Sequence, residues 1–250
     1  MKIHLSRWVC LDLESNLMRF REEAQRAAGA GARMVVFPEL FLTGYGRPLD
    51  PSRARSAFQE ASAAAGDVLF VFGSISEQRR NRLTVWLGGR EVAHYDKVHL
   101  FKPNREHELW QAGERYTAFR WQGSTVGLLN CNDVRFPEQA RALRLEARCD
   151  LMVAPAWWPW RRDHVWRTLL RARAIENGVF VLGCSIAGSV FPGEDFAGAG
   201  NYVFDPLGNP LPTPDDRSYE IAVDSPPPLV VDPLGEAVRI EEVRVVDTPG

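Results

Sequence analysis

The 250-residue chain has little charge of one sign and no long apolar run. Its longest apolar patches, such as residues 151–155, are strand-sized, far below the roughly 18 to 20 residues of a membrane-spanning helix. The formal net charge is only -2, so no basic surplus is available to bind nucleic acid or an anionic membrane. We therefore expect its partners to be small molecules or further copies of the chain.

Cysteine is also scarce, with only Cys10, Cys131, Cys149 and Cys184. These four are scattered, and no CxxC pair or Cys/His spacing typical of zinc is present, so neither a disulfide framework nor a zinc site is expected. The opening MKIHLSRWVCLDLESN is interrupted by charges and does not read as a signal peptide. A reducing cytoplasm is the expected location.

Apolar residues occur alternately in strand-sized runs and in amphipathic helical stretches, which is typical of an α/β fold. No linker divides the chain, so we predict one domain over residues 1–250, close to the roughly 250 residues at which single cores stop growing. Strands are expected at 3–9, 33–37, 68–72, 83–87, 91–95, 116–121, 125–130, 151–154 and 179–184, with the fourth and fifth joined as a hairpin. Helices are expected after Ser15 as N-cap as far as about 28, and at 51–65, 137–148 and 163–176, with a polar loop at 97–115.

The last part of the chain differs, because glycine and proline become frequent and helical periodicity disappears. We predict that residues 188–250 form a short, irregular, β-rich segment of the same domain. Its expected extended pieces are 202–204, 219–223, 229–231 and 238–246.

Three polar side chains stand at the ends of expected buried strands, where a rigid element can aim them into a crevice. Glu39 follows Met-Val-Val-Phe-Pro, and taken alone it reads as a helix-capping or loop-anchoring glutamate. Lys97 taken alone reads as a surface lysine paired with Asp96. Cys131 precedes a strand-to-helix turn whose N–H groups favour a thiolate and can hold an oxyanion, whereas the other three cysteines read as small buried hydrophobes. Together, a thiol, a carboxylate and an ammonium form a complete set for acyl transfer.

Four blocks of sequence carry a resemblance to a known family. They are GARMVVFPELFLTGY (31–45), YDKVHLF (95–101), GLLNCNDVRFPE (127–138) and RTLLRARAIENGVFV (167–181). In this order, over about the first four fifths of the chain, they resemble the nitrilase superfamily, the carbon-nitrogen hydrolases. The resemblance implies an αββα sandwich of two stacked sheets with helices on the outer faces. It also implies subunits that pair through their helices as a homodimer or a larger assembly.

The resemblance further implies a Glu-Lys-Cys triad, matched here by Glu39, Lys97 and Cys131. A second glutamate of the family usually stands seven positions before a glycine, and Glu106 has that spacing to Gly113. Glu108 is closer to the glycine and is kept as the alternative. The chemistry requires no metal and no organic cofactor.

The triad predicts a mechanism of nucleophilic catalysis. Glu39 takes the proton of Cys131, and the thiolate attacks the carbon of an amide or a nitrile. Lys97 and the backbone N–H of Asn132 stabilise the oxyanion, Glu39 protonates the leaving ammonia or amine, and water hydrolyses the thioester. Glu106 is expected to position Lys97 or the substrate.

Aromatic residues near the triad are candidates for the substrate pocket, namely Tyr45, Trp157 and Trp158. Such a cluster is as often core or dimer contact. Two pairs, Arg135 with Glu138 and Arg173 with Glu176, are interpreted as ion pairs that hold the catalytic loops.

Rival chemistries have weaker support in the sequence. A metal site built from His94, His99 and His107 with Glu106 or Glu108 matches no zinc motif. A serine hydrolase is not indicated, because the chain contains no GxSxG elbow.

The departures from the family pattern bear on the substrate. Asn132 follows the cysteine where nitrilases proper usually have Trp-Glu, and an Asn-Asp pair there also resembles carbamoylases that cleave N-carbamoyl amino acids. The block WPWRRDHVWRTLLRARAIEN most resembles the omega-amidase and predicted-amidohydrolase branch. We therefore expect hydrolysis of a small linear amide, with carbamoyl and nitrile substrates as alternatives. A catalytically silent member that serves for binding or assembly is the alternative of another class.

Overall fold

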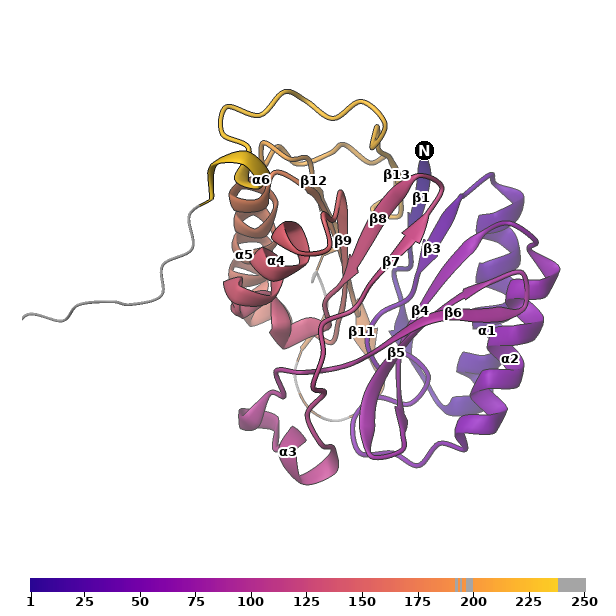
Figure 1. Cartoon of the computed structure of the whole chain (residues 1–250). Coiled ribbons are helices and arrows are strands. Elements are labelled where there is room, and N and C mark those ends of the chain that lie inside the picture. Colours follow the sequence, from indigo (N-terminus) through magenta and orange to yellow (C-terminus); the bar gives the residue numbers. More distant parts are fainter. Residues whose placement is uncertain (192, 194, 197–199, 238–250) are drawn as a thin grey trace, which may run out of the picture.

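The computed structural model describes residues 1–191, 193, 195–196 and 200–237, which form two stacked β-sheets with helices on their outer faces (Figure 1). The strands are β1 (Lys2–Leu5), β2 (Val9–Cys10), β3 (Met34–Val36), β4 (Leu69–Glu77), β5 (Arg80–Leu87), β6 (Arg90–Asp96), β7 (Ala118–Trp121), β8 (Ser124–Leu128), β9 (Leu151–Ala156), β10 (Phe180–Ser185), β11 (Gly188–Ser189), β12 (Tyr202–Phe204) and β13 (Ser218–Glu220). One sheet has the order β13-β1-β3-β4-β5-β6 and the other β12-β10-β9-β8-β7, while β11 and β2 pair separately.

Helices cover both sheets. They are α1 (Leu13–Gly29), α2 (Pro51–Ala64), α3 (Glu106–Leu109), α4 (Pro137–Leu145), α5 (Asp163–Asn177) and α6 (Pro233–Glu236). α1 and α2 lie on the outer face of the first sheet, and α4 and α5 lie on the outer face of the second (Figure 1). The predicted αββα sandwich is therefore confirmed.

Alternation along the strands divides the core into layers. In β3, Val35 packs with the aromatic residues under α1 and α2, whereas Met34 and Val36 face the second sheet. Val153 of β9 belongs to the same layer between the sheets, and Met152 packs under α4 and α5. Burial of both faces explains why these strands read as continuous apolar runs.

Parallel pairing brings the functional loops to one edge of the molecule. β1, β3 and β4 run parallel, as do β8, β9 and β10. The segments that follow β3, β8 and β9 contain Glu39, Cys131 and Trp157. Carboxyl ends of parallel strands are the usual place for a binding crevice.

The predicted helix 51–65 and the hairpin through Gly88 and Gly89 are confirmed, but three local predictions are wrong. Asp12, not Ser15, caps α1, because the Asp12 carboxylate accepts hydrogen bonds from both the N–H and the hydroxyl of Ser15 (3.0 and 2.7 Å). The strand expected at 3–9 is interrupted between β1 and β2, where the Trp8 indole turns inward and donates to the Phe41 carbonyl. The loop expected at 97–115 contains α3 and the 3-10 helix Lys102–Asn104.

The described residues of the C-terminal segment contain short regular elements separated by loops. β12 matches the expected 202–204, and β13 overlaps 219–223. The extended piece expected at 229–231 is wrong, since those residues form no strand and the short helix α6 follows them. The piece expected at 238–246 lies outside the described residues.

All four cysteines are free and buried, in agreement with the structural interpretation of Cys10, Cys149 and Cys184. Among the helices described, none is both long and apolar enough to cross a membrane.

Candidate active site

Glu39 is placed by the close approach of the Pro38 backbone, which follows β3, to strand β4. The β4 strand bulges between Val71 and Ser74, and Gly73 in this bulge has φ +51°. A Cβ atom on Gly73 would lie 1.8 Å from the Pro38 carbonyl oxygen, so only glycine fits. The following N–H, that of Leu40, donates to the Ser74 hydroxyl at 3.2 Å. The turn carrying Glu39 is thus fixed against β4.

The Glu39 carboxylate is completely buried and accepts hydrogen bonds on both oxygens. Oε1 accepts from Lys97 Nζ at 2.8 Å and from Asn81 Nδ2 at 2.9 Å. Oε2 accepts from the Trp157 backbone N–H at 3.0 Å, and the Tyr45 hydroxyl oxygen lies 3.4 Å from it. These donors satisfy a buried charge that is otherwise very costly.

Lys97 is fully buried at the end of β6 and is not the surface residue that its neighbour Asp96 indicated. Its Nζ lies 2.8 Å from Glu39 Oε1 and 2.9 Å from Glu106 Oε1. Burial disfavours the ammonium, but the two carboxylates outweigh it and raise the pKa of Lys97. Lys97 therefore remains a cation.

The two candidate glutamates of the loop have different environments. Glu106 is fully buried, and its Oε2 accepts from the Phe101 N–H at 2.8 Å while Oε1 contacts Lys97. Glu108 lies at the surface and pairs with Arg105 at 2.6 Å. The loop that starts at Lys97 and carries both glutamates is closed by Gly113, whose N–H donates to the Lys97 carbonyl at 2.9 Å. A Cβ on Gly113 would be 2.1 Å from the Asp96 carbonyl oxygen, which explains the glycine at that spacing.

Cys131 begins the 3-10 helix Cys131–Arg135 and has φ +52°, a strained conformation for a residue other than glycine. Its Sγ lies 4.0 Å from the Trp157 carbonyl oxygen. Burial and the neighbouring Glu39 raise the pKa of the Cys131 thiol well above its ordinary value, although Lys97 acts in the opposite direction. The expectation that the turn favours a resting thiolate is therefore wrong, and a base is needed to remove the proton.

Asn132 lies second in the same 3-10 helix and is 6% exposed. Its side-chain amide donates to the His99 carbonyl at 3.0 Å, which fixes the residue. The first N–H groups of a helix have no acceptor within it, so the backbone N–H of Asn132 is suitably placed in the chain to meet an anion.

Asp133 anchors the Cys131 turn and was missed in the sequence. Its buried carboxylate accepts from the Tyr95 hydroxyl and the Asn130 N–H, both at 2.8 Å, and from the His99 N–H at 3.0 Å and ring Nδ1 at 2.8 Å. The spacing Asn130-x-x-Asp133 is that of a capping box, and this signal was available before the structure.

Asn81 on β5 was also missed, since a lone asparagine in a strand carries no signal. Its Nδ2 donates to Glu39, its Oδ1 accepts from Asn130 Nδ2 at 3.2 Å, and its carbonyl accepts the Lys97 N–H at 3.0 Å. The Asn81 residue thus links Glu39, Lys97 and the Cys131 turn.

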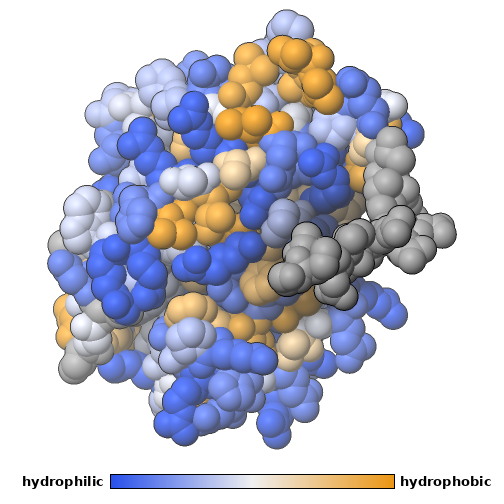
Figure 2. All heavy atoms as spheres, turned by 90° about the vertical axis from the view of Figure 1, so that its left-hand side faces the viewer, coloured by the Kyte–Doolittle hydropathy of each residue, from blue (hydrophilic) through white to orange (hydrophobic). Residues whose placement is uncertain are grey.

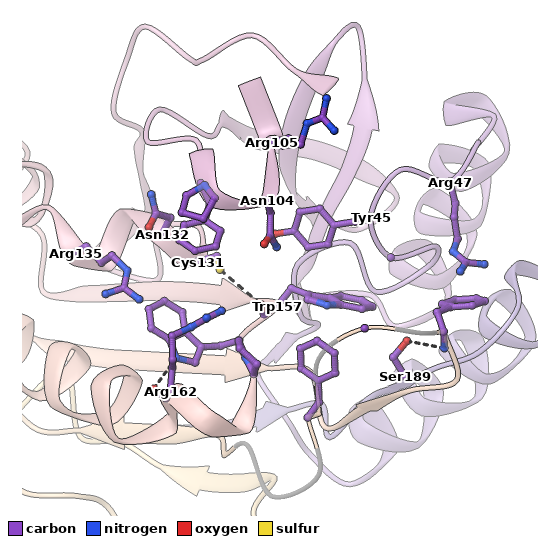
Figure 3. A pocket seen from close by; sticks show the side chains of 18 residues that line it. Tyr45, Arg47, Asn104, Arg105, Cys131, Asn132, Arg135, Trp157, Arg162 and Ser189 are labelled. Atoms are coloured by element: carbon purple, nitrogen blue, oxygen red, sulfur yellow. Dashed lines mark hydrogen bonds between the residues drawn. The ribbon is translucent and has the colours of Figure 1, made fainter. Parts of the chain in front are cut away.

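A cavity of about 390 Å³ opens beside Cys131 (Figure 3). Of the three aromatic candidates, Tyr45 and Trp157 line it with partly exposed rings that contact each other edge to face at 5.9 Å. Trp158 lines it too, but it is 3% exposed and packs on Trp166 in the core. In the view of Figure 3, Cys131 and Tyr45 reach the cavity from different sides, and Trp157 lies below the Tyr45 ring.

The described lining carries four arginines and no carboxylate: Arg47, Arg105, Arg135 and Arg162. Arg135 is half-buried, with its guanidinium 4.6 Å from the Trp158 ring centre. The predicted Arg135–Glu138 ion pair is wrong, because Glu138 points to solvent on the first turn of α4. Burial lowers the pKa of Arg135, and the nearby Arg162 adds to this.

The second predicted ion pair, between Arg173 and Glu176, is present. Arg173 also donates to the Val134 carbonyl at 3.0 Å and so supports the Cys131 turn from α5. The histidines of the rival metal hypothesis are separate, since His94 pairs with Glu91 and His99 with Asp133. Within the described part of the chain, no three His, Cys, Asp or Glu side chains are grouped as metal ligands.

Comparison with known proteins agrees with this geometry. The family model for carbon-nitrogen hydrolases matches residues 3–224. The omega-amidase YafV of Escherichia coli strain K12 is 32% identical over 215 residues, 83% of this chain and 81% of that protein. The 2-oxoglutaramate amidase of Bacillus subtilis strain 168 is 34% identical over 191 residues, 72% of this chain and 73% of that protein.

Solved structures give the same result. A variant of the amidase from Nesterenkonia sp. AN1 is 29% identical with a TM-score of 0.74, covering 84% of this chain and 85% of that chain. That structure carries the acetamide moiety of fluoroacetamide covalently added at its active-site cysteine. The chain therefore belongs to the carbon-nitrogen hydrolases of the nitrilase superfamily and is an enzyme that hydrolyses carbon–nitrogen bonds other than peptide bonds.

Proposed function

We propose that the protein is an amidase that uses Cys131 as nucleophile and acts on a small linear omega-amide, an amide whose far end carries a carboxylate. The observation that carries the proposal is the buried Lys97 ammonium, bonded to two carboxylates beside a thiol that needs a base. Its relatives include an omega-amidase and a 2-oxoglutaramate amidase.

The first half-reaction forms a thioester. Glu39 accepts the Cys131 proton, and the thiolate adds to the amide carbon while the carbonyl π electrons move to oxygen. Lys97 has three donors, of which Glu39 and Glu106 occupy two, so one N–H is left for the oxyanion together with the Asn132 N–H. The oxyanion collapses, the C–N bond breaks, and Glu39 delivers its proton to the departing ammonia.

The second half-reaction returns the enzyme to its first state. Water gives a proton to Glu39 and adds to the thioester carbon, the C–S bond breaks, and the Cys131 sulfur recovers the proton. Glu106 fixes Lys97 throughout, since it contacts the Nζ that Glu39 also contacts. The residues present are sufficient for both steps, so no metal or organic cofactor is part of the proposal.

The omega-amide specificity rests on the cationic side of the cavity. Its volume of about 390 Å³ is at the small end for ligand pockets, which suits a short substrate. Arginine binds carboxylates with paired hydrogen bonds, and Arg135 has no carboxylate partner among the described residues.

The proposed assembly is a homodimer that pairs through the helical face shown in Figure 2. Apolar side chains are exposed there, among them Ile175 on α5 at 51% and Val231 before α6 at 57%. Sedimentation velocity on the wild type and on Ile175→Glu measures this assembly, and a monomeric wild type contradicts it.

Four free, buried cysteines support a reducing, cytoplasmic location.

The test of function is a substrate panel of omega-amides, N-carbamoyl amino acids and nitriles. Reactions are quenched with acid, and intact mass and ammonia are measured. We expect an acyl adduct and ammonia from omega-amides with the wild type, and neither with Cys131→Ala. Absence of both adduct and ammonia across the whole panel contradicts the proposal. Preferential turnover of a carbamoyl compound or a nitrile contradicts the omega-amide as substrate.

A further inference from the structure

Most of the polar groups around Glu39 can serve only an ionised carboxylate. A carboxylate offers about four acceptor sites; Lys97, Asn81 and the Trp157 N–H donate to three of them, and the Tyr45 hydroxyl oxygen lies beside the fourth. In the proposed function, however, Glu39 holds a proton between deprotonation of the thiol and departure of ammonia. A protonated Glu39 then needs a partner that can accept.

Three of the four partners cannot accept. The ammonium of Lys97 and the backbone N–H of Trp157 have no lone pair to offer. The Asn81 group that faces Glu39 is the amide nitrogen, because its oxygen accepts from Asn130. Only the Tyr45 hydroxyl oxygen has lone pairs, and it lies 3.4 Å from Glu39 Oε2.

The Tyr45 proton is directed elsewhere. Its hydroxyl lies 2.8 Å from Glu106 Oε1, a much shorter contact than the one to Glu39. Donation to Glu106 turns the hydroxyl lone pairs toward Glu39 Oε2. Burial and the carboxylates Glu39 and Glu106 raise the pKa of Tyr45 well above its ordinary value, so the hydroxyl keeps its proton.

We propose that Tyr45 is a positioning residue that donates to Glu106 and accepts a hydrogen bond from the protonated form of Glu39. This inference rests on the proposed function and concerns the half of the cycle in which Glu39 is an acid. The proton that leaves Cys131 is held on Glu39 Oε2 against the Tyr45 oxygen until the leaving nitrogen takes it. Tyr45 itself neither gains nor loses a proton.

Tyr45→Phe removes the hydroxyl and keeps the ring, which contacts Trp110 and Trp157 at 5.9 Å. Without the acceptor, the protonated form of Glu39 loses stability, so the step in which Glu39 gives its proton to the leaving nitrogen becomes slower. We expect kcat on the amide to fall about tenfold, with KM changed by less than about threefold. The loss should be smaller on a p-nitrophenyl ester, whose leaving group needs no proton.

Tyr116→Phe is the matched control, because Tyr116 is 38% exposed and outside the cavity lining. It should keep the wild-type kcat on both the amide and the ester. If Tyr45 has only a structural role, Tyr45→Phe loses activity on the amide and on the ester to the same extent. An equal loss on the two substrates, or no loss on the amide, overturns the inference. A wild type that hydrolyses no amide refutes the proposed function first, whereas an active wild type with equal losses in Tyr45→Phe refutes this inference alone.

Discussion

Two groups of charges near Cys131 are held in opposite ways. Outside the cavity lining, Glu39, Lys97 and Glu106 are fully buried, and each contacts fixed partners on neighbouring elements. On the arginine side, within the lining itself, Arg135 is half-buried and Arg47 lies over the Phe191 ring, so both pack against aromatic faces. Buried charges with complete sets of partners are fixed in place, whereas guanidinium groups stacked on rings remain able to pair with an incoming anion. In the proposed function the buried group performs the chemistry and the arginine side selects the substrate.

The strongest way to break this comparison is to remove the nucleophile. Cys131→Ala should reduce amide turnover by at least about a thousandfold, because no other group forms the thioester. Ammonia release measures the loss, and the thermal midpoint should be nearly unchanged. Cys149→Ala is the matched control. Cys149 is a buried cysteine of the layer under α4 and α5, and its replacement should leave activity in place. Retention of more than a few per cent of activity in Cys131→Ala contradicts the assignment.

Removal of the buried cation should have the next largest effect. Lys97→Met leaves two carboxylates facing each other without the ammonium and removes an oxyanion donor. We expect kcat to fall by roughly a hundredfold or more, as for other oxyanion donors. Single-turnover kinetics should show the loss in acylation, and a normal acylation rate would place Lys97 outside the chemistry.

The two glutamates of the α3 segment sharpen the comparison, since one is buried and the other is not. Glu106→Ala unpairs Lys97 and Tyr45 and should lower kcat at least about tenfold. Glu108→Ala removes only a surface pair with Arg105 and should change kcat less than about twofold. The reverse order of the two effects would contradict the role assigned to Glu106.

The arginine side should respond in KM and in selectivity. Arg135→Gln should lower kcat/KM for an omega-amide about tenfold, through KM, while a neutral amide such as butyramide changes less than about threefold. Arg120→Gln, at an exposed position of β7, is the charge-matched control. An equal loss on both substrates would mean that Arg135 supports the loop and does not read a carboxylate.

The smallest expected effect concerns stability at high pH. Burial raises the pKa of Cys10 to about 11 and that of Cys149 to about 12, so both stay neutral in the folded state when an unfolded thiol ionises near 9. Between these values the unfolded state releases protons first, and the free energy of unfolding falls as pH rises. We expect a loss of about 1 kcal/mol per cysteine between pH 8 and 10, measured by urea unfolding with and without Cys149→Ala. A free energy of unfolding that does not change between pH 8 and 10 contradicts the raised pKa values of these two cysteines as its cause.

Sequence reasoning predicted most of the elements and singled out Glu39 and Cys131 because these depend on local patterns, whereas the grouping of Glu39, Lys97 and Cys131 as a triad came with the resemblance. Strand-sized apolar runs, a proline before Glu39 and a helix start after Cys131 are visible along the chain. The two-sheet stacking came only from the resemblance, since both faces of these strands are buried and no alternation distinguishes them.

Contacts between distant segments could not be predicted in the same way. Asn81 meets Glu39 and Asn130 only after β5 packs beside β4, and Tyr45 meets Glu106 across 61 positions of chain. Arg135 seemed to pair with Glu138 because the two are neighbours in sequence, yet helix α4 turns Glu138 outward. The state of the Cys131 thiol was mispredicted because its desolvation depends on the whole surrounding fold.

The bond between Glu39 and the Trp157 N–H joins the two sheets, since Glu39 follows β3 and Trp157 follows β9. Neither half of the chain can therefore assemble a working centre alone. During refolding, regain of enzymatic activity would report the docking of one sheet on the other, while circular dichroism would report the formation of helices and strands. Recovery of activity is therefore a direct measure of complete docking of the two sheets during refolding.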